Sequence, residues 1–176
     1  MDAPAAWLTT EQMGLTALLL QSHQEVFHRP LLASNGEEPS LRLRCQELFV
    51  CGFPVLAHTN AADPLLSYAN AAALQLWETH WAELIGMPSR LTAPPSERNE
   101  RHQALGQAKQ REAIEGYRGI RISRKGHRFM INNGRIWTLR DDENRPVGQA
   151  ACFSDWWWLT PPRSRNDRID RPVHLY

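Results

Sequence analysis

Three side chains with N–H donors, those of Arg90, Arg121 and Gln149, are the best candidates for binding a small molecule. Their N–H groups can donate to an anionic or carbonyl-bearing ligand. We add Tyr117 and Trp137 to the candidate binding residues. A second interpretation stays open, because most buried polar groups are satisfied within the protein. These side chains could instead bond to acidic residues or main-chain carbonyls and fix helices onto a sheet.

No sequence motif supports catalysis. The chain contains no GxSxG, HExxH, GxxxxGK[ST] or GxGxxG, so nucleophile elbows, zincin sites and phosphate loops have no support. Its three cysteines, Cys45, Cys51 and Cys152, form no CxxC pair and have no metal-ligand spacing. We therefore expect no catalytic residues, no metal site and no enzyme activity.

Charge and hydropathy narrow the class of partner. The net charge of the 176 residues is +1, although residues 114–176 carry twelve Arg or Lys against seven Asp or Glu. A basic excess spread over strands and a tail is typical of a solvated face, so nucleic-acid binding is not expected. The apolar run Leu18–Leu20 is far too short to cross a membrane. An odd number of cysteines without a secretory signal favours the cytoplasm.

Helix and strand signals give an α+β order. Thr9 and Gln12 are spaced as a capping box at the start of an amphipathic helix, and Leu31–Pro39 has the composition of a linker. Strand, helix and turn patterns follow in the order β-β-α-α-α-β-β-β. We predict an N-terminal helix and linker over 1–40, a domain over 41–159 with a five-stranded antiparallel sheet and helices on one face, and an extended or disordered tail over 160–176.

The alternation of side chains along a strand predicts which residues share a face. Tyr117, Gly119, Arg121 and Ser123 share one face of their strand, and Gln149, Ala151 and Phe153 share one face of the last strand. On the strand between them, strict alternation places the following residues together: Phe129, Ile131, Asn133, Arg135, Trp137 and Leu139. The pattern does not determine which face is inward.

Several short segments resemble the MEKHLA domain. They are, in order, Asp63–Asn70, Ala73-Leu74, Trp81, Gly86–Leu91, Glu100-Arg101, Tyr117–Ser123, Gly126–Phe129, Trp137 and Gly148–Ala151, which together span about residues 48–157. This family is similar to PAS domains, and the predicted element order agrees with that PAS-like fold. It occurs as small stand-alone bacterial proteins and as the C-terminal module of plant homeodomain–leucine-zipper regulators, where it is linked to control of dimerisation.

The resemblance implies a sensory or regulatory module that binds a small molecule, a protein partner or both. Two alternatives stay open: a dimerisation module without a pocket, and a noncovalent flavoprotein or small enzyme. Covalent flavin chemistry of the light-oxygen-voltage type is disfavoured, because the segment Trp81–Arg90 has no cysteine. Gln149 lies where such domains place a flavin-contacting Gln, so noncovalent flavin stays open. Haem is not expected, because His102, its one candidate ligand, lies on a polar helix.

The sequence Trp156-Trp157-Trp158 predicts a surface for association. Alternation buries either Trp157 or its two neighbours, so at least one indole ring should be exposed. An exposed aromatic ring beside an amphipathic helix is typical of an interface. We expect a homodimer that uses residues around Leu15–Phe27 and Trp156–Trp158.

Overall fold

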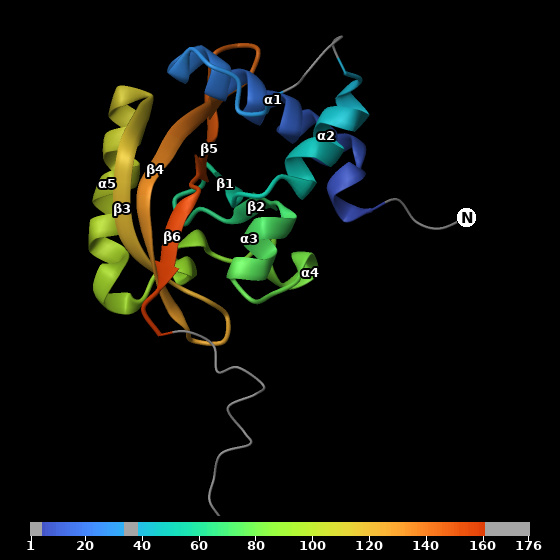
Figure 1. Cartoon of the computed structure of the whole chain (residues 1–176). Helices are drawn as coiled ribbons and strands as arrows, with labels where there is room; N and C mark the ends of the chain where they lie inside the picture. Colours follow the sequence, from blue (N-terminus) through green and yellow to red (C-terminus); the bar gives the residue numbers. More distant parts are fainter. Residues whose placement is uncertain (1–4, 34–38, 161–176) are drawn as a thin grey trace, which may run out of the picture.

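The computed structural model describes residues 5–33 and 39–160, and its strands form a six-stranded antiparallel sheet (Figure 1). The helices are α1 (Thr10–Phe27), α2 (Leu41–Val50), α3 (Ala71–Leu76), α4 (Trp81–Leu84) and α5 (Arg98–Arg111). Short 3₁₀ turns lie at Ala6–Leu8, Ser89–Thr92 and Pro95–Glu97. The strands are β1 (Val55–Thr59), β2 (Leu66–Ala69), β3 (Ala113–Ile122), β4 (Arg128–Arg140), β5 (Pro146–Cys152) and β6 (Asp155–Trp158). None of the described helices is long and apolar enough to cross a membrane.

The strand order β2-β1-β5-β4-β3 confirms the predicted α+β antiparallel sheet, with one strand more than expected. The sequence favours a single last strand, but the chain leaves the sheet at Phe153-Ser154 and re-enters it as β6. β5 pairs with the second half of β4, and β6 pairs with its first half, with Phe129 opposite Trp158. β6 therefore continues the course of β5, because both strands pair with β4. The predicted tail lies outside the described residues from 161 onward, as do residues 34–38 of the predicted linker.

A bulge in β4 overturns the face assignment made for that strand. Asn133 has a positive φ of 53°, and the pairing of β3 with β4 shifts register around Tyr117. One extra residue in a strand reverses the alternation beyond it. Phe129 therefore packs in the core on the α3–α5 side, whereas Trp137 packs in the core beneath α1. The predicted alternation is confirmed for the buried positions of β3, where Tyr117, Gly119, Arg121 and Ser123 alternate with more exposed residues.

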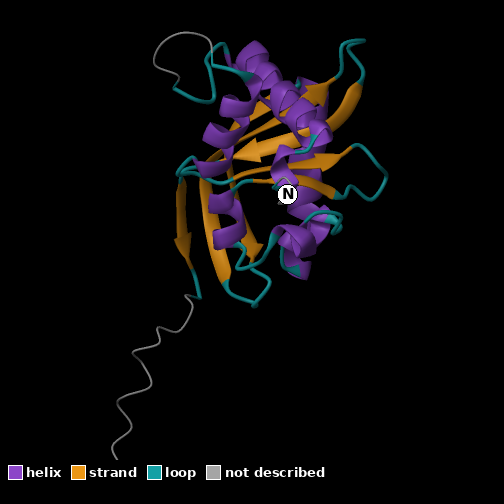
Figure 2. Cartoon of the chain, turned by 90° about the vertical axis from the view of Figure 1, so that its right-hand side faces the viewer, coloured by secondary structure: helices purple, strands orange, loops and turns teal. Residues whose placement is uncertain are grey.

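The helices α3, α4 and α5 pack on one face of the sheet, as predicted, and the N-terminal helix covers the other face together with α2. α1 and α2 lie together on one side and α5 lies on the other (Figure 1), and Figure 2 shows a layer of helices in front of the strands. Leu19 of α1 and Leu48 of α2 are fully buried in the same core cluster as Trp137 of β4. Burying a leucine side chain contributes about 1.5–3 kcal/mol. The N-terminal helix is thus packed on the sheet of its own chain, which leaves this face of α1 unavailable to a second copy.

His23 attaches α1 to the sheet and to the segment that follows the helix. Its Nδ1 lies 3.1 Å from the carbonyl oxygen of Arg29, and its ring meets the Trp137 ring edge-on at 5.0 Å. Burial, with a smaller effect from the Arg135 charge, lowers the pKa of His23 to about 4. The ring is therefore neutral near pH 7 and belongs to the core.

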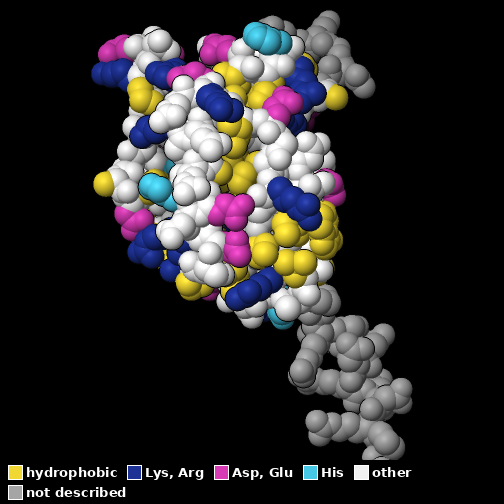
Figure 3. All heavy atoms as spheres, turned by 90° about the vertical axis from the view of Figure 1, so that its left-hand side faces the viewer, with side chains coloured by type: hydrophobic (Ala, Val, Ile, Leu, Met, Phe, Trp, Pro, Cys, Tyr) yellow, Lys and Arg dark blue, Asp and Glu magenta, His cyan; other side chains and the backbone are white. Residues whose placement is uncertain are grey.

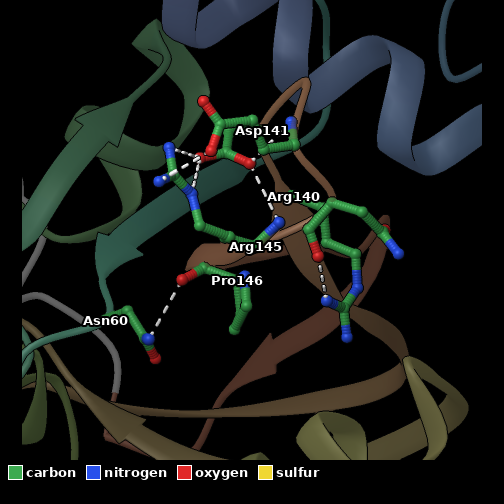
Figure 4. A network of polar contacts seen from close by, with 7 residues as sticks. Asn60, Arg140, Asp141, Arg145 and Pro146 are labelled. Atoms are coloured by element: carbon green, nitrogen blue, oxygen red, sulfur yellow. Dashed lines mark hydrogen bonds and ion pairs between the residues drawn. The ribbon is translucent and has the colours of Figure 1, made fainter.

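Polar contacts close the β4–β5 turn and attach it to the loop after β1 (Figure 4). Asp141 accepts hydrogen bonds from the backbone and the side chain of Arg145, both at 2.9 Å. The Nδ2 of Asn60 donates to the carbonyl oxygen of Pro146 at 3.1 Å. These contacts hold β1 and β5 in a register that places His58 opposite Gln149.

The side chain of Asn70 joins four segments at the centre of the fold. It is fully buried, and its Oδ1 accepts from the backbone N–H of Val55 at 2.9 Å and of Ala73 at 3.1 Å. Its Nδ2 donates to the carbonyl oxygens of Leu48 at 3.2 Å and Phe53 at 2.8 Å. One amide therefore caps α3, begins β1 and satisfies the end of α2.

We predict that Asn70→Ala lowers the free energy of unfolding by about 3 kcal/mol or more, because it leaves several buried backbone groups without partners. Ser40→Ala is the matched control, since Ser40 caps the exposed start of α2 by accepting from Leu43 N–H at 3.3 Å. We expect that control to cost about 1 kcal/mol or less. Urea unfolding measures both changes, and equal small losses would contradict the central role of Asn70.

Candidate functional site

A small cavity lies between the sheet and α5. Its volume is about 60 Å³, which is enough for roughly four water molecules or a very small ligand. The apolar part of its lining comes from Leu56, Leu66, Trp77, Leu105, Ile131, Ile136 and Phe153. The polar part comes from His58, Thr92, Arg101, Tyr117, Arg121, Arg135 and Gln149. The cavity is therefore an apolar chamber with a few polar groups, three of which are arginines; the guanidinium of Arg135 also lies over the ring of Phe27 on α1.

Arg121 on β3 reaches the cavity with its charge unpaired. Only 6% of the residue is exposed. Its guanidinium donates to the hydroxyl of Tyr117 at 2.7 Å and to the carbonyl oxygen of Ile120 at 2.8 Å, and it lies 5.2 Å from the centre of the Tyr117 ring. Within the described part of the chain no carboxylate forms an ion pair with it. A guanidinium has five N–H donors, so donors remain for a ligand.

Arg101 on α5 brings a second positive charge to the same cavity. Burial, with a smaller effect from the neighbouring Arg121 charge, lowers the pKa of Arg101 to about 10. None of the ion pairs among residues 5–33 and 39–160 includes Arg101. Two like charges in a partly desolvated site repel each other and attract an anion. The candidate residues did not include Arg101, although it lies in the matched segment Glu100-Arg101.

His58 and Gln149 form a cross-strand pair at the edge of the cavity. The Gln149 Nε2 donates to the carbonyl oxygen of Leu105 at 3.0 Å, which fastens α5 to β5. The His58 Nδ1 lies 2.8 Å from the carbonyl oxygen of Thr59. Burial, followed in smaller measure by the Arg101 and Lys109 charges, lowers the pKa of His58 to about 4. His58 is therefore neutral near pH 7, and its Nδ1 carries the hydrogen that the carbonyl accepts.

A larger basin of about 480 Å³ opens beside the cavity, along α5 and the loop after β1. The two spaces share four lining residues, His58, Arg101, Leu105 and Gln149. Arg90 lies in this basin, where its half-exposed side chain pairs with Asp63 at 3.2 Å. Arg98 and Lys109 also line it, so the approach to the cavity is positively charged, which favours the arrival of anions.

The structure brings together three of the five candidate residues. Tyr117, Arg121 and Gln149 line the cavity. Arg90 lies in the outer basin, paired with Asp63 as the alternative interpretation expected. Trp137 lies on the opposite face of the sheet, because the β4 bulge turns its side chain toward α1.

The polar groups of the cavity serve two purposes at once. Gln149 fastens a helix and Arg121 bonds to Tyr117, so both have internal partners. The guanidinium of Arg121 nevertheless has no ion-pair partner in the part of the chain that the structure describes. Within the described ranges, no cluster of three or more His, Cys, Asp or Glu residues could hold a metal ion.

Comparison with known proteins identifies the family. The MEKHLA domain profile matches residues 13–158, and the chain belongs to this family. The match begins within α1, so the family's similarity extends across the helix that covers the sheet. A search of curated proteins found no match.

Solved structures with similar folds are PAS and light-oxygen-voltage domains. An RNA-binding light-oxygen-voltage receptor aligns with a TM-score of 0.56 and 19% identity, over 72% of this chain and 36% of the receptor chain. The PAS domain of a protein from Colwellia psychrerythraea aligns with a TM-score of 0.59 and 14% identity, over 66% and 97%. A light-oxygen-voltage domain studied with a flavin analogue aligns with a TM-score of 0.53 and 17% identity, over 70% and 87%. The chain thus spans about a third of the receptor, and these similarities establish its PAS-like fold.

The residues of this cavity do not fit a flavin. A pocket for a ligand of drug size usually has a volume of about 300–1,000 Å³, far above the volume found here. The Arg121–Tyr117 pair and the bond from Gln149 to α5 occupy the space between sheet and helix. The three cysteines lie on α2, just after it and on β5, away from the segment that would supply a flavin adduct. His102, the haem candidate, is exposed on α5.

Gly119 allows Tyr117 to lie along its own strand and reach Arg121. A Cβ at position 119 would collide with the Tyr117 hydroxyl. We predict that Gly119→Ala displaces the Tyr117 ring and lowers the free energy of unfolding by about 1–3 kcal/mol. Gly14→Ala on α1, where an added Cβ meets nothing within 4 Å, is the control and should stabilise by up to about 1 kcal/mol. Thermal unfolding measures both, and a neutral Gly119→Ala would contradict this placement of Tyr117.

Proposed function

We propose that this MEKHLA domain is a sensory or regulatory module that binds a small anion in the cavity beneath α5. The observation that carries the proposal is the presence of Arg101 and Arg121 in one small cavity without an acidic partner in the described ranges. A desolvated, unpaired charge costs on the order of several kcal/mol. An anion bound between the two guanidinium groups would offset that cost.

Binding would change how firmly α5 is held. The helix is polar, and only Ala108 among its residues is fully buried. It contacts the sheet chiefly beside β3 and through the bond from Gln149 to Leu105. An anion that joins Arg101 on α5 to Arg121 on β3 would add a charged link across this interface. The proposed signal is therefore a change in the position or the mobility of α5.

We also propose that the protein binds its ligand without chemical conversion, and that it acts in the cytoplasm. The cavity offers neutral His58, three arginines, hydroxyl groups and the thiol of Cys152, but no cysteine or carboxylate from the described ranges is placed beside His58 by a hydrogen bond. All three cysteines are free thiols, and two of them are buried, which suits a reducing compartment.

The two arginines allow a test that separates binding from a structural role. We predict that Arg101→Met leaves the melting temperature of the free protein unchanged or raises it, because the change removes a charge that repels Arg121. The same variant should bind small carboxylates at least about tenfold more weakly than the unmodified protein, a loss of about 1.4 kcal/mol or more. Melting temperatures with acetate, lactate, phosphate and the neutral compound glycerol measure the effect.

Arg111→Met is the matched control, because Arg111 is exposed at the end of the same helix and lines neither the cavity nor the basin. It should retain the ligand-dependent rise in melting temperature. A large loss of stability in free Arg101→Met, together with no response of the unmodified protein to any anion, would refute the proposed function.

A second candidate function, association between copies of the chain, rests on a different observation. Trp157 on β6 is 40% exposed, and the Arg118 guanidinium lies over its ring at 5.8 Å. Its cross-strand neighbour is Met130, which in turn pairs with Ile120 on β3. Figure 3 shows hydrophobic side chains gathered on this side of the molecule, close to where the described chain ends. We propose that a homodimer would use this uncovered part of the sheet.

We predict that Trp157→Glu shifts the protein toward the monomer, because it places a charge in the centre of the proposed contact. Val50→Glu is the control, since Val50 is 70% exposed at the end of α2, on a different surface. Light scattering at micromolar concentrations measures the molecular mass. If the unmodified protein is monomeric at all of these concentrations, the proposed contact is ruled out.

A further inference from the structure

We infer that the ligand is a short carboxylate with a hydroxyl group on the neighbouring carbon, bound by Arg101 and Arg121 through its carboxylate and by His58 through its hydroxyl. This inference rests on the proposed function and goes further, because it specifies the class of anion. The inference depends on His58, which supplies an observation separate from the charges of the two arginines.

His58 presents an unsatisfied acceptor. The residue is 8% exposed, and its Nε2 is buried without a hydrogen-bond partner in the described part of the chain. Because Nδ1 is held by the carbonyl oxygen of Thr59, the hydrogen of the neutral ring resides on Nδ1 and the lone pair on Nε2. A buried acceptor without a partner is unfavourable, so the site is completed by a ligand that donates a hydrogen bond.

The charge of the site determines which donor is suitable. A hydroxyl and an ammonium group can both donate to the Nε2 of His58. An ammonium group would lie beside two guanidinium groups and would be repelled by both. A hydroxyl group carries no charge, so it matches the acceptor without this repulsion. The site therefore favours a hydroxy acid over an amino acid.

The walls and the size of the cavity favour an organic anion. Leu56, Leu66, Ile136 and Phe153 offer apolar contacts that inorganic phosphate or sulfate cannot use. The small cavity, which shares lining residues with the outer basin, admits only a short ligand, so the carboxylate and the hydroxyl of that ligand must be close to each other. A hydroxyl on the carbon next to the carboxylate meets that condition, and lactate is the simplest chiral compound of the class.

The test compares lactate with propionate, which has the same carbon chain and lacks the hydroxyl. We expect calorimetric titration of the unmodified protein to give at least about tenfold tighter binding for lactate. In His58→Phe the preference should disappear, because the acceptor is gone, while propionate binding stays within a few fold. His80→Phe is the control, since His80 is exposed at the start of α4 and should keep the preference.

Each outcome decides one of the two proposals. Equal binding of lactate and propionate to the unmodified protein would overturn the role of His58 and leave the proposed function intact. Tighter binding of inorganic phosphate, or of alanine, would overturn the assignment to hydroxy acids. Failure of every anion to bind would refute the proposed function itself. The comparison of the two ligands on the unmodified protein holds even if His58→Phe does not fold.

Discussion

The buried amide of Asn70 is the contact on which the arrangement of this domain depends. Its oxygen fixes the starts of β1 and α3, and its nitrogen holds the end of α2. β1 lies between β2 and β5, so its position determines where His58 meets Gln149. The Asn70 side chain therefore positions α2 on one face of the sheet. It also positions the His58–Gln149 edge of the cavity on the other face. Its hydrogen bonds are satisfied, which is what makes a buried polar group stabilising rather than costly.

The cavity is built on the opposite principle, since its charges have no acidic partners among residues 5–33 and 39–160. Arg101 on α5 and Arg121 on β3 line the same cavity, and the Nε2 of His58 likewise has no partner in those ranges. Stability alone would favour apolar residues at these positions. Polar groups that are unfavourable in the free protein and complementary to a ligand are characteristic of a binding site. The contrast with Asn70 is the physical reason for assigning function to the cavity rather than to the junction.

The sequence predicts the element order and which residues of β3 share a face, but local irregularities decide the rest. Strict alternation places Phe129 and Trp137 together, and one residue with positive φ, Asn133, separates them. Pro54 suggests an edge strand, yet β1 begins at Val55, just after it, and is paired on both sides. Arg101 lies on a helix whose composition indicates solvent exposure, so only its tertiary position reveals its role. These features depend on how segments pack, which periodicity does not encode.

The two faces of the sheet are connected through adjacent residues of the same strands. Gln149 faces α5 and the cavity, while the next residue, Ala150, packs in the core under α1. Ile136 lines the cavity. The next residue, Trp137, packs edge-on against the rings of His23 and Phe27 on α1. Since a packed core resists small displacements of its members, a shift of β4 or β5 that accompanies binding acts on α1 as well as on α5. The helix α1 is thus coupled through the packed core to the proposed ligand site, although none of its residues lines the cavity.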